Sequence, residues 1–306
     1  MPAIRYQHAT KPMLYVYTPA DGQNTEGIGA MAQYQIHTYN LAQQIGLEFI
    51  GRDFTNLQHY QQYGTKEEYC QECTDFFNFP NRIELPDIEV VKCREVGEIG
   101  DYLGSEEDKI IEIHNFALMH YADSSFAGWA RNLTLAPLAN YINFDKSKCY
   151  FSEEKVNVAV HIRNFTGTDN DPSPTREYFE PGGDKEKYFL TLMNRIEEYF
   201  EGDKEFHIYS QGEDEWFDAF LNQGWDVKLH INEHPLTSLY HMMKAKVRVM
   251  SNSSMSYLSS LYGTGVSFAR ENFPHKTFNT LYTDYQGNLV EDSTPPQGSI
   301  NFKFDE

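Results

Sequence analysis

The sequence predicts an α/β protein with two domains, each a parallel sheet wound with helices, and three observations indicate this. The chain has 306 residues, roughly twice the length of a typical domain. Its second half alternates short β-branched runs with amphipathic stretches, the pattern of a doubly wound sheet. Its first half opens with the order strand, glycine-containing loop and helix. We expect domains at residues 1–150 and 151–306.

In the first domain, runs of β-forming residues predict strands at 13–18, 47–50, 88–92 and 110–114. Helical periodicity predicts a helix over 30–45 that ends at Gly46. Its apolar face comprises Met31, Tyr34, Thr38, Leu41, Ala42 and Ile45. Residues 53–85 are polar and poorly periodic, so we expect short helices and loops there. Residues 116–143 are expected to be mostly helical, with Pro137 as a break.

In the second domain, strands are predicted at 156–162, 206–210, 227–231, 247–250 and 266–268. Helices are predicted between them, at about 185–200, 214–222, 236–245 and 254–262. The last ~35 residues lack periodicity, so we expect them to wrap back over the surface or across to the first domain. A doubly wound sheet binds its ligand at the carboxyl ends of its strands.

Charge limits the classes of partner. Lys and Arg number 25 against 45 Asp and Glu, a net charge of −20. This balance argues against binding duplex nucleic acid or an anionic membrane surface, so an anionic ligand must meet a local basic spot. No apolar run reaches the length of a membrane span. We therefore expect a cytoplasmic protein.

The four cysteines form no disulfide framework. Cys70 and Cys73 have the spacing of metal ligands or of a redox pair, but no second pair accompanies them. Ordinary reduced thiols are favoured over structural zinc.

Polar residues follow the strand at 156–162. Alternation along that strand places His161 and Arg163 on one side of the chain. An arginine at a strand end can clamp a phosphate with two hydrogen bonds. The alternative is an ion pair with Asp169 or Asp171.

Two further segments carry small residues next to predicted helices. Residues 251–256 (SNSSMS) open a helix, so they form an anion site or a helix cap without a ligand. Gly27 and Gly29 precede the first helix but lack the full dinucleotide-binding pattern. We expect this loop to close over a nucleotide held by the other domain.

Asp169 and Asp171 form a D-x-D sequence in a turn-rich loop. Such a pair can hold a divalent ion, act as a catalytic or hydroxyl-binding acid, or belong to a solvated turn. The sequence leaves all three interpretations open.

These motifs resemble those of the GT-B fucosyltransferases, the α-1,2 enzymes and the related α-1,6 and Nod-factor enzymes, over residues 155–265 and 25–45. VAVHIR is similar to their His-x-Arg motif, which implies donor pyrophosphate binding by Arg163 with support from His161. FHIYSQGEDEW implies a weaker role for Ser210 and Asp214. The block that ends in Asn252, Ser253 and Ser254 implies donor contacts, and EGIGAMAQYQI implies that Gly27 and Gly29 lie near the nucleotide.

The sequence departs from this family at two places. Asn164, Phe165 and Thr166 stand where the relatives have Arg-x-Asp, so the general base is open between Asp169 and Asp171, with Glu177 and Glu26 in reserve. Ser238 stands where relatives carry an acid that helps hold the nucleoside, so the base of the donor is open too.

The resemblance implies two Rossmann-like domains of the GT-B type with the nucleotide-sugar site in the cleft. It implies an inverting transfer of a sugar, foremost L-fucose from GDP-fucose, to a glycan hydroxyl, with no required metal. One alternative is another donor, such as UDP-xylose, a rhamnose donor or another GDP-sugar. The others are a non-catalytic nucleotide- or glycan-binding protein on a transferase scaffold, and a manganese-dependent GT-A enzyme that uses Asp169 and Asp171.

Three glycosylation sequons begin at Asn132, Asn164 and Asn252, and two of them fall within the expected donor site. A glycan there would block the site, which favours a bacterial or viral cytoplasmic enzyme. A lumenal domain trimmed of its anchor would have the same sequence.

Overall fold

The structure of the chain is a computed structural model. It describes residues 13–18, 26–114, 142–164, 181–271, 273 and 279–290. None of the helices in these ranges is long and apolar enough to span a membrane.

The first sheet has four parallel strands in the order β2-β1-β4-β3. They are β1 (Leu14–Tyr17), β2 (Glu48–Phe49), β3 (Val90–Cys93) and β4 (Lys109–Ile113). Helix α1 (Ile28–Ile45) connects β1 to β2, and α2 (Lys66–Phe77) and the 3₁₀ helix η1 (Val96–Asp101) follow. The parallel arrangement confirms the predicted α/β class for this half.

The second sheet has six parallel strands in the order β10-β9-β8-β5-β6-β7. They are β5 (Val156–His161), β6 (Lys204–Ser210), β7 (Val227–Ile231), β8 (Val247–Val249), β9 (Val266–Arg270) and β10 (Thr280–Thr283). The helices among them are α5 (Asp184–Tyr199), α6 (Asp218–Leu221), α7 (Pro235–Lys244) and α8 (Ser254–Tyr262), with the 3₁₀ helices η3 (Lys146–Lys148) and η4 (Asp214–Phe217).

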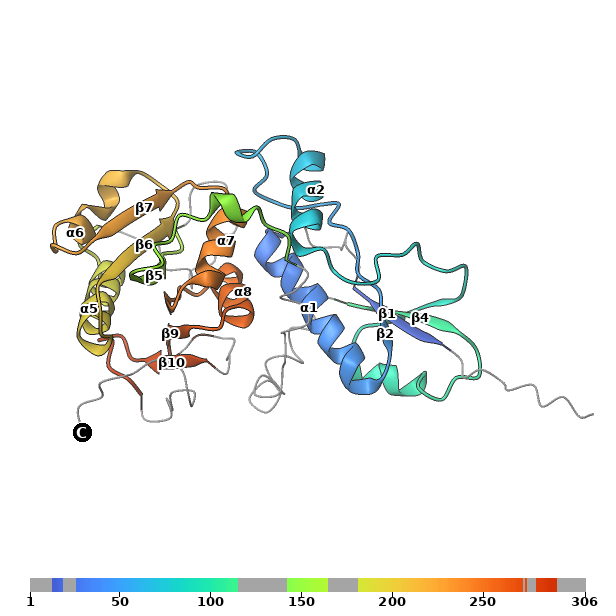
Figure 1. The fold of residues 1–306 in the computed structure, drawn as a ribbon. Coiled ribbons are helices and arrows are strands. Elements are labelled where there is room, and N and C mark those ends of the chain that lie inside the picture. The colour runs from blue at the N-terminus through green and yellow to red at the C-terminus, as the bar shows by residue number, and fades with distance from the viewer. Residues whose placement is uncertain are drawn as a thin grey trace, which may run out of the picture.

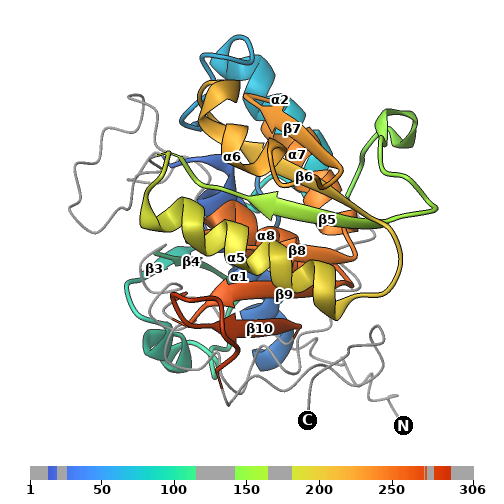
Figure 2. The same ribbon diagram turned by 90° about the vertical axis from the view of Figure 1, so that its left-hand side faces the viewer.

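Helices cover both faces of the second sheet, and Figure 2 shows α5 lying across one of them. Alternate residues of β5 face opposite ways: Val158 and Val160 pack with α5 and α6, whereas Ala159 belongs to the cluster that includes α7 and α8. His161 lies on the α8 side, with its Nδ1 2.7 Å from Ser256 Oγ, as the strand alternation predicts. Arg163 follows the end of β5, and a shared side for its side chain stays a prediction.

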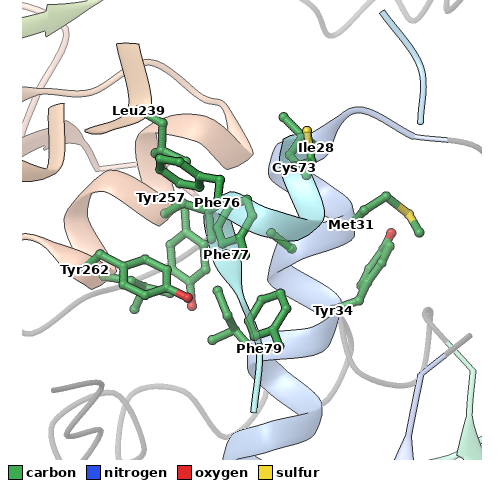
Figure 3. Close-up of a cluster of buried hydrophobic side chains, with 14 of the residues drawn as sticks. Ile28, Met31, Tyr34, Cys73, Phe76, Phe77, Phe79, Leu239, Tyr257 and Tyr262 are labelled. Atoms are coloured by element: carbon green, nitrogen blue, oxygen red, sulfur yellow. The ribbon is translucent and has the colours of Figure 1, made fainter. Parts of the chain in front are cut away.

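The two halves meet through helices rather than through their sheets. Figure 1 shows α1 and α2 beside α7 and α8, and Figure 3 shows their side chains packed in one apolar cluster. Phe77 of α2, for example, lies with its ring centroid 6.4 Å from that of Tyr262 of α8. The domain division at residue 150 stays a prediction, because this shared core includes residues from both sides of it.

Two segments form regular elements that the sequence does not predict. Residues 66–77 form one continuous helix where short helices and loops are predicted. Thr65 and Glu68 start it with a reciprocal capping box, and Asn78 ends it in the left-handed conformation. In the tail, which is predicted to have no regular structure, residues 280–283 form β10 and pair with β9.

Two other predicted helices have different outcomes. The stretch 214–222 forms η4 followed by the four-residue α6 instead of one helix. The helix predicted over 116–143, including Pro137, falls almost entirely outside the described residues.

Candidate anion site at the carboxyl edge of the second sheet

The strand order locates the expected binding edge. From β5 the chain builds outward through β6 to β7, then returns to the other side of β5 and builds outward through β8, β9 and β10. The order therefore reverses between β5 and β8, and in such sheets ligands bind outside the carboxyl ends of the strands at this switch point. His161 ends β5, and the serine-rich run 251–256 follows β8. The structure brings the two predicted motifs together.

A ring of hydrogen bonds joins these strand ends. The Ser251 hydroxyl donates to the carbonyl of His161 over 2.6 Å and accepts from the amide of Arg163 over 2.8 Å. The Ser251 amide donates to Ser256 Oγ over 3.1 Å, and that oxygen lies 2.7 Å from His161 Nδ1. Sequence reasoning marked the serine run but missed that Ser251 and Ser256 make these bonds. Their position directly after β8 and one turn into α8 was the available signal.

His161 is neutral in this setting. Burial, and then the charges of Arg163 and Lys185, lower the pKa of His161 to about 3. The side chain therefore holds Ser256 and the first turn of α8 in place, and the positive charge comes from its neighbours.

Arg163 and Lys185 supply that charge. Arg163 Nη1 lies 3.4 Å from Gln211 Oε1, and Lys185 Nζ donates to the carbonyl of Arg163. Lys185 was not among the predicted site residues; its place in the first turn of α5, the helix after β5, was the signal that could have found it. Two cations at one sheet edge form the local basic spot that a chain of net charge −20 needs for an anionic ligand.

Asn252, Ser253 and Ser254, which are predicted to contact the donor, differ in what they do. Ser253 caps α8, since its hydroxyl accepts from the amide of Met255 over 3.2 Å. Asn252 is exposed, and Ser254 is half-buried. The cap interpretation thus applies to Ser253, and a cap is compatible with an anion at the helix start because the remaining amides of the first turn still point outward.

The glycine-containing loop reaches the same place from the first half. A Cβ at Gly29 would lie 3.0 Å from the Met255 amide nitrogen and 3.0 Å from Ser254 Cβ, so the first turns of α1 and α8 touch only because residue 29 has no side chain. Gly27 is the N-cap of α1 and lies against the ring of His59. Two helix N-termini, each with a partial positive charge, converge near the strand ends.

Ser210 and Asp214, the two residues with a weaker predicted role at the donor, have different surroundings. The Ser210 hydroxyl donates to the carbonyl of Ile162 over 2.8 Å and ties the end of β6 to that of β5. Asp214 is exposed in the first turn of η4 and stands apart from the hydrogen-bonded ring.

Of the four candidate general bases, the structure describes only Glu26. Asp169, Asp171 and Glu177 lie outside the described residues. Glu26 precedes α1, and its carboxylate accepts from the Tyr34 hydroxyl over 3.1 Å. Burial, and then the Glu26 charge, raise the pKa of Tyr34.

Within the described ranges, no three His, Cys, Asp or Glu side chains come together as metal ligands. Cys70 and Cys73 lie on α2 as free, buried thiols, and burial raises the pKa of both. Such thiols are poor nucleophiles.

Comparisons with known proteins return structures but no sequence relatives. No protein-family model matches the chain, and no curated protein does. Among solved structures, the α-1,6-fucosyltransferase NodZ soaked with GDP-fucose aligns with a TM-score of 0.45 at 10% identity, covering 93% of this chain and 100% of NodZ. POFUT1 in complex with GDP-fucose aligns with a TM-score of 0.43 at 13% identity, covering 90% of this chain and 98% of POFUT1. NodZ from Bradyrhizobium aligns with a TM-score of 0.41 at 10% identity, covering 92% and 98%. Similarity of this degree assigns neither an activity nor a substrate to this chain.

Proposed function

We propose that this protein is an inverting glycosyltransferase that binds a nucleotide sugar at the carboxyl edge of the second sheet, with GDP-fucose as the first candidate donor and a glycan hydroxyl as acceptor. The observation that carries the proposal is the meeting of the His161-x-Arg163 motif with the serine-rich start of α8 at the switch point. The resemblance of these same motifs to fucosyltransferases supports it.

In this proposal the diphosphate of the donor is bound by Arg163, Lys185 and the first turn of α8. These groups stabilise the charge that develops as the bond between the sugar and the diphosphate breaks, and they are already in place before reaction. His161, Ser210, Asn252, Ser253 and Ser254 position the donor, with Asp214 at the rim and Gly27 and Gly29 closing from the first half.

The acceptor hydroxyl loses its proton to a carboxylate as its oxygen bonds to the anomeric carbon. We assign that role to Asp169 or Asp171, which follow Arg163 by six and eight residues. No metal is required in this scheme, since the diphosphate is neutralised by cationic side chains and amides.

One contact favours a guanine base. Ser238 stands where the family resemblance implies an acid, and its hydroxyl donates to Glu233 Oε2 over 2.8 Å. A carboxylate therefore lies beside this position although the residue itself is serine. Burial opposes ionisation, but His230, and then the hydrogen bonds from Ser238 and Tyr150, lower the pKa of Glu233. An ionised carboxylate accepts from N–H groups of the kind that guanine presents.

A non-catalytic binding protein on the same scaffold is the second candidate. Asn164 stands where the resemblance implies a second arginine, and it is buried, donating to the carbonyl of Gln211 over 3.0 Å. Position 164 therefore has a structural role here and supplies no second cation.

The test is turnover with nucleotide sugars. We would incubate the protein with GDP-fucose, other GDP-sugars, UDP-xylose and a rhamnose donor, with and without chelator, and measure release of the nucleoside diphosphate with water as acceptor. We expect release from GDP-fucose that survives chelation and is lost in Arg163→Ala but kept in Arg195→Ala, which removes a cation that bonds Asn288 instead. Preference for a UDP-sugar would overturn the fucosyl assignment, and no release from any donor would favour the binding protein.

A further inference from the structure

A tryptophan lies at the rim of the candidate site. Trp216 belongs to η4, the 3₁₀ helix after β6, and is 36% exposed, whereas the next residue, Phe217, is fully buried and anchors η4 in the second core. Tryptophan combines a large apolar ring, which can stack on another ring, with one N–H donor. The ring of Trp216 lies against Gly212, and the residue before that glycine, Gln211, accepts a hydrogen bond from Arg163.

Gly212 determines where this ring lies. Its φ of +126° is accessible to glycine alone, and a Cβ at this residue would lie 2.5 Å from Trp216 Cζ3 and 3.3 Å from Asn164 Nδ2. The indole ring of Trp216 and the side chain of Asn164 therefore both lie against Gly212. No other residue at 212 would let the ring rest there.

The loop that carries the ring is fixed from several sides. Asn232, itself at a φ of +58°, accepts from the Gly212 amide over 3.2 Å and donates to the Gly212 carbonyl over 2.9 Å. The Asn164 amide holds the Gln211 carbonyl, and the Gln211 side chain accepts from Arg163. Two uncommon backbone conformations held by this many bonds are typical of functional loops. The result is a rigid connection between the cation of the site and an exposed indole.

The charges around Trp216 define what it can meet. Glu213, Asp214 and Glu215 are all exposed on the same short stretch. They repel phosphate but accept hydrogen bonds from N–H and O–H groups. The surroundings fit a neutral ring that bears hydrogen-bond donors and is attached to a phosphate held by Arg163.

We propose that Trp216 stacks on the ring that the phosphorylated ligand carries, and so determines which ring the site accepts. The inference rests on the proposed function and deepens it. The stacked ring is either the nucleobase or the sugar, and the experiment below distinguishes these two rings.

The experiment follows tryptophan emission and ligand affinity in the full chain. The sequence contains Trp129, Trp216 and Trp225. Trp225 is the matched control because it lies just before β7, at the amino end of that strand, whereas the candidate site lies at the carboxyl ends. Its ring packs on Phe206. Wild type, Trp216→Phe, Trp216→Leu and Trp225→Phe would be titrated with GDP, with fucose 1-phosphate and with inorganic pyrophosphate.

We expect GDP to change the emission of wild type and Trp225→Phe alike, and Trp216→Phe to lose most of this change. Trp216→Leu should bind GDP about tenfold more weakly, the size of one lost stacking contact, while its affinity for pyrophosphate is kept. A change produced by fucose 1-phosphate in place of GDP would identify the sugar as the stacked ring. A merely structural tryptophan would alter the melting temperature without altering these readouts.

Two results would overturn the inference, and they differ in what else they remove. If Trp216→Phe keeps the full emission change and Trp216→Leu binds all three ligands as wild type does, the inference falls while the proposed function stands. If wild type binds none of the three ligands, the proposed function falls first and the role of Trp216 falls with it.

Discussion

Arg248 lies in β8, and its side chain is almost completely buried. It is 1% exposed, and its guanidinium donates to the carbonyls of Ala245 and Gly265 and to Ser267 Oγ. Ala245 caps the C-terminus of α7, so the cation also faces the negative end of a helix. Burial lowers the pKa of Arg248 to about 9, which leaves it charged at neutral pH. The side chain joins α7, β8 and β9.

We expect Arg248→Ala to lower the free energy of unfolding by about 3 kcal/mol, because it leaves buried carbonyls without donors and opens a cavity. Urea unfolding would measure this, with Arg195→Ala on the half-exposed side of α5 as control. A loss no larger than that of the control would contradict this account of Arg248.

His207 is a second buried residue with a testable charge state. Its ring lies 3.1 Å from Glu205 Oε2 and 3.0 Å from His230 Nε2, under the ring of Tyr150. Burial, and then the charges of His230, His241 and Lys228, lower the pKa of His207 to about 3 against the opposing charge of Asp226. His207 is therefore neutral in the folded protein near pH 5.

An unfolded histidine titrates near pH 6.5, so between about pH 6.5 and 3 the unfolded chain binds a proton that folded His207 does not. Its contribution to stability is complete above pH 6.5 and is lost as the pH falls. We expect His207→Gln to lower the slope of the unfolding free energy with pH between pH 6.5 and 4.5, because about one proton fewer is taken up on unfolding. Equal slopes for the variant and wild type, measured by urea unfolding, would show that His207 is protonated in the fold.

At the scale of elements, the contact of α1 with α8 positions the site. The sequence predicts one apolar face for α1, but the structure also buries polar residues of the other faces, such as Gln33, Gln35 and Asn40. Gln35 is accommodated because its side-chain amide exchanges two hydrogen bonds with the backbone of Arg52. A helix buried on this many sides is held by both halves.

Substitution of Gly29 tests this contact. We expect Gly29→Ala to cost about 1–3 kcal/mol of stability, since the added methyl group must push the first turns of α1 and α8 apart, and to weaken nucleotide binding. Gly100→Ala is the matched control, because a Cβ there meets nothing within 4 Å. The same melting temperature and affinity for both variants would contradict the packing account.

The elements that sequence reasoning found and missed differ in the kind of signal they carry. Strand β5 and helix α8 were predicted almost to the residue, because β-branched alternation and a serine cap are local patterns. Helix α2 was missed although Thr65 and Glu68 form a capping-box pattern that could have revealed it. Strand β10 has only four residues and is specified by pairing with β9, which no local pattern encodes.

At the scale of the whole molecule, the halves are joined by more than apolar packing. His37 Nε2 of α1 lies 3.2 Å from the Tyr257 hydroxyl of α8, and Glu72 Oε2 of α2 lies 3.1 Å from His234 Nε2. The ring of Phe144 stacks on Tyr240 at 4.0 Å. Such contacts between residues far apart in sequence were beyond single-sequence reasoning, which predicted the motifs of the site but not the serine bonds that assemble them.

The central claim is that a strongly acidic protein binds a nucleoside diphosphate at one basic sheet edge, and a thermal-shift measurement with GDP tests it most directly. A ligand at ~100 times its dissociation constant adds about 2.7 kcal/mol of stability. We predict that GDP raises the melting temperature of wild type and Arg195→Ala and leaves that of Arg163→Ala unchanged. Equal stabilisation of Arg163→Ala, or no stabilisation of wild type by GDP, UDP, dTDP or CDP, would contradict the account.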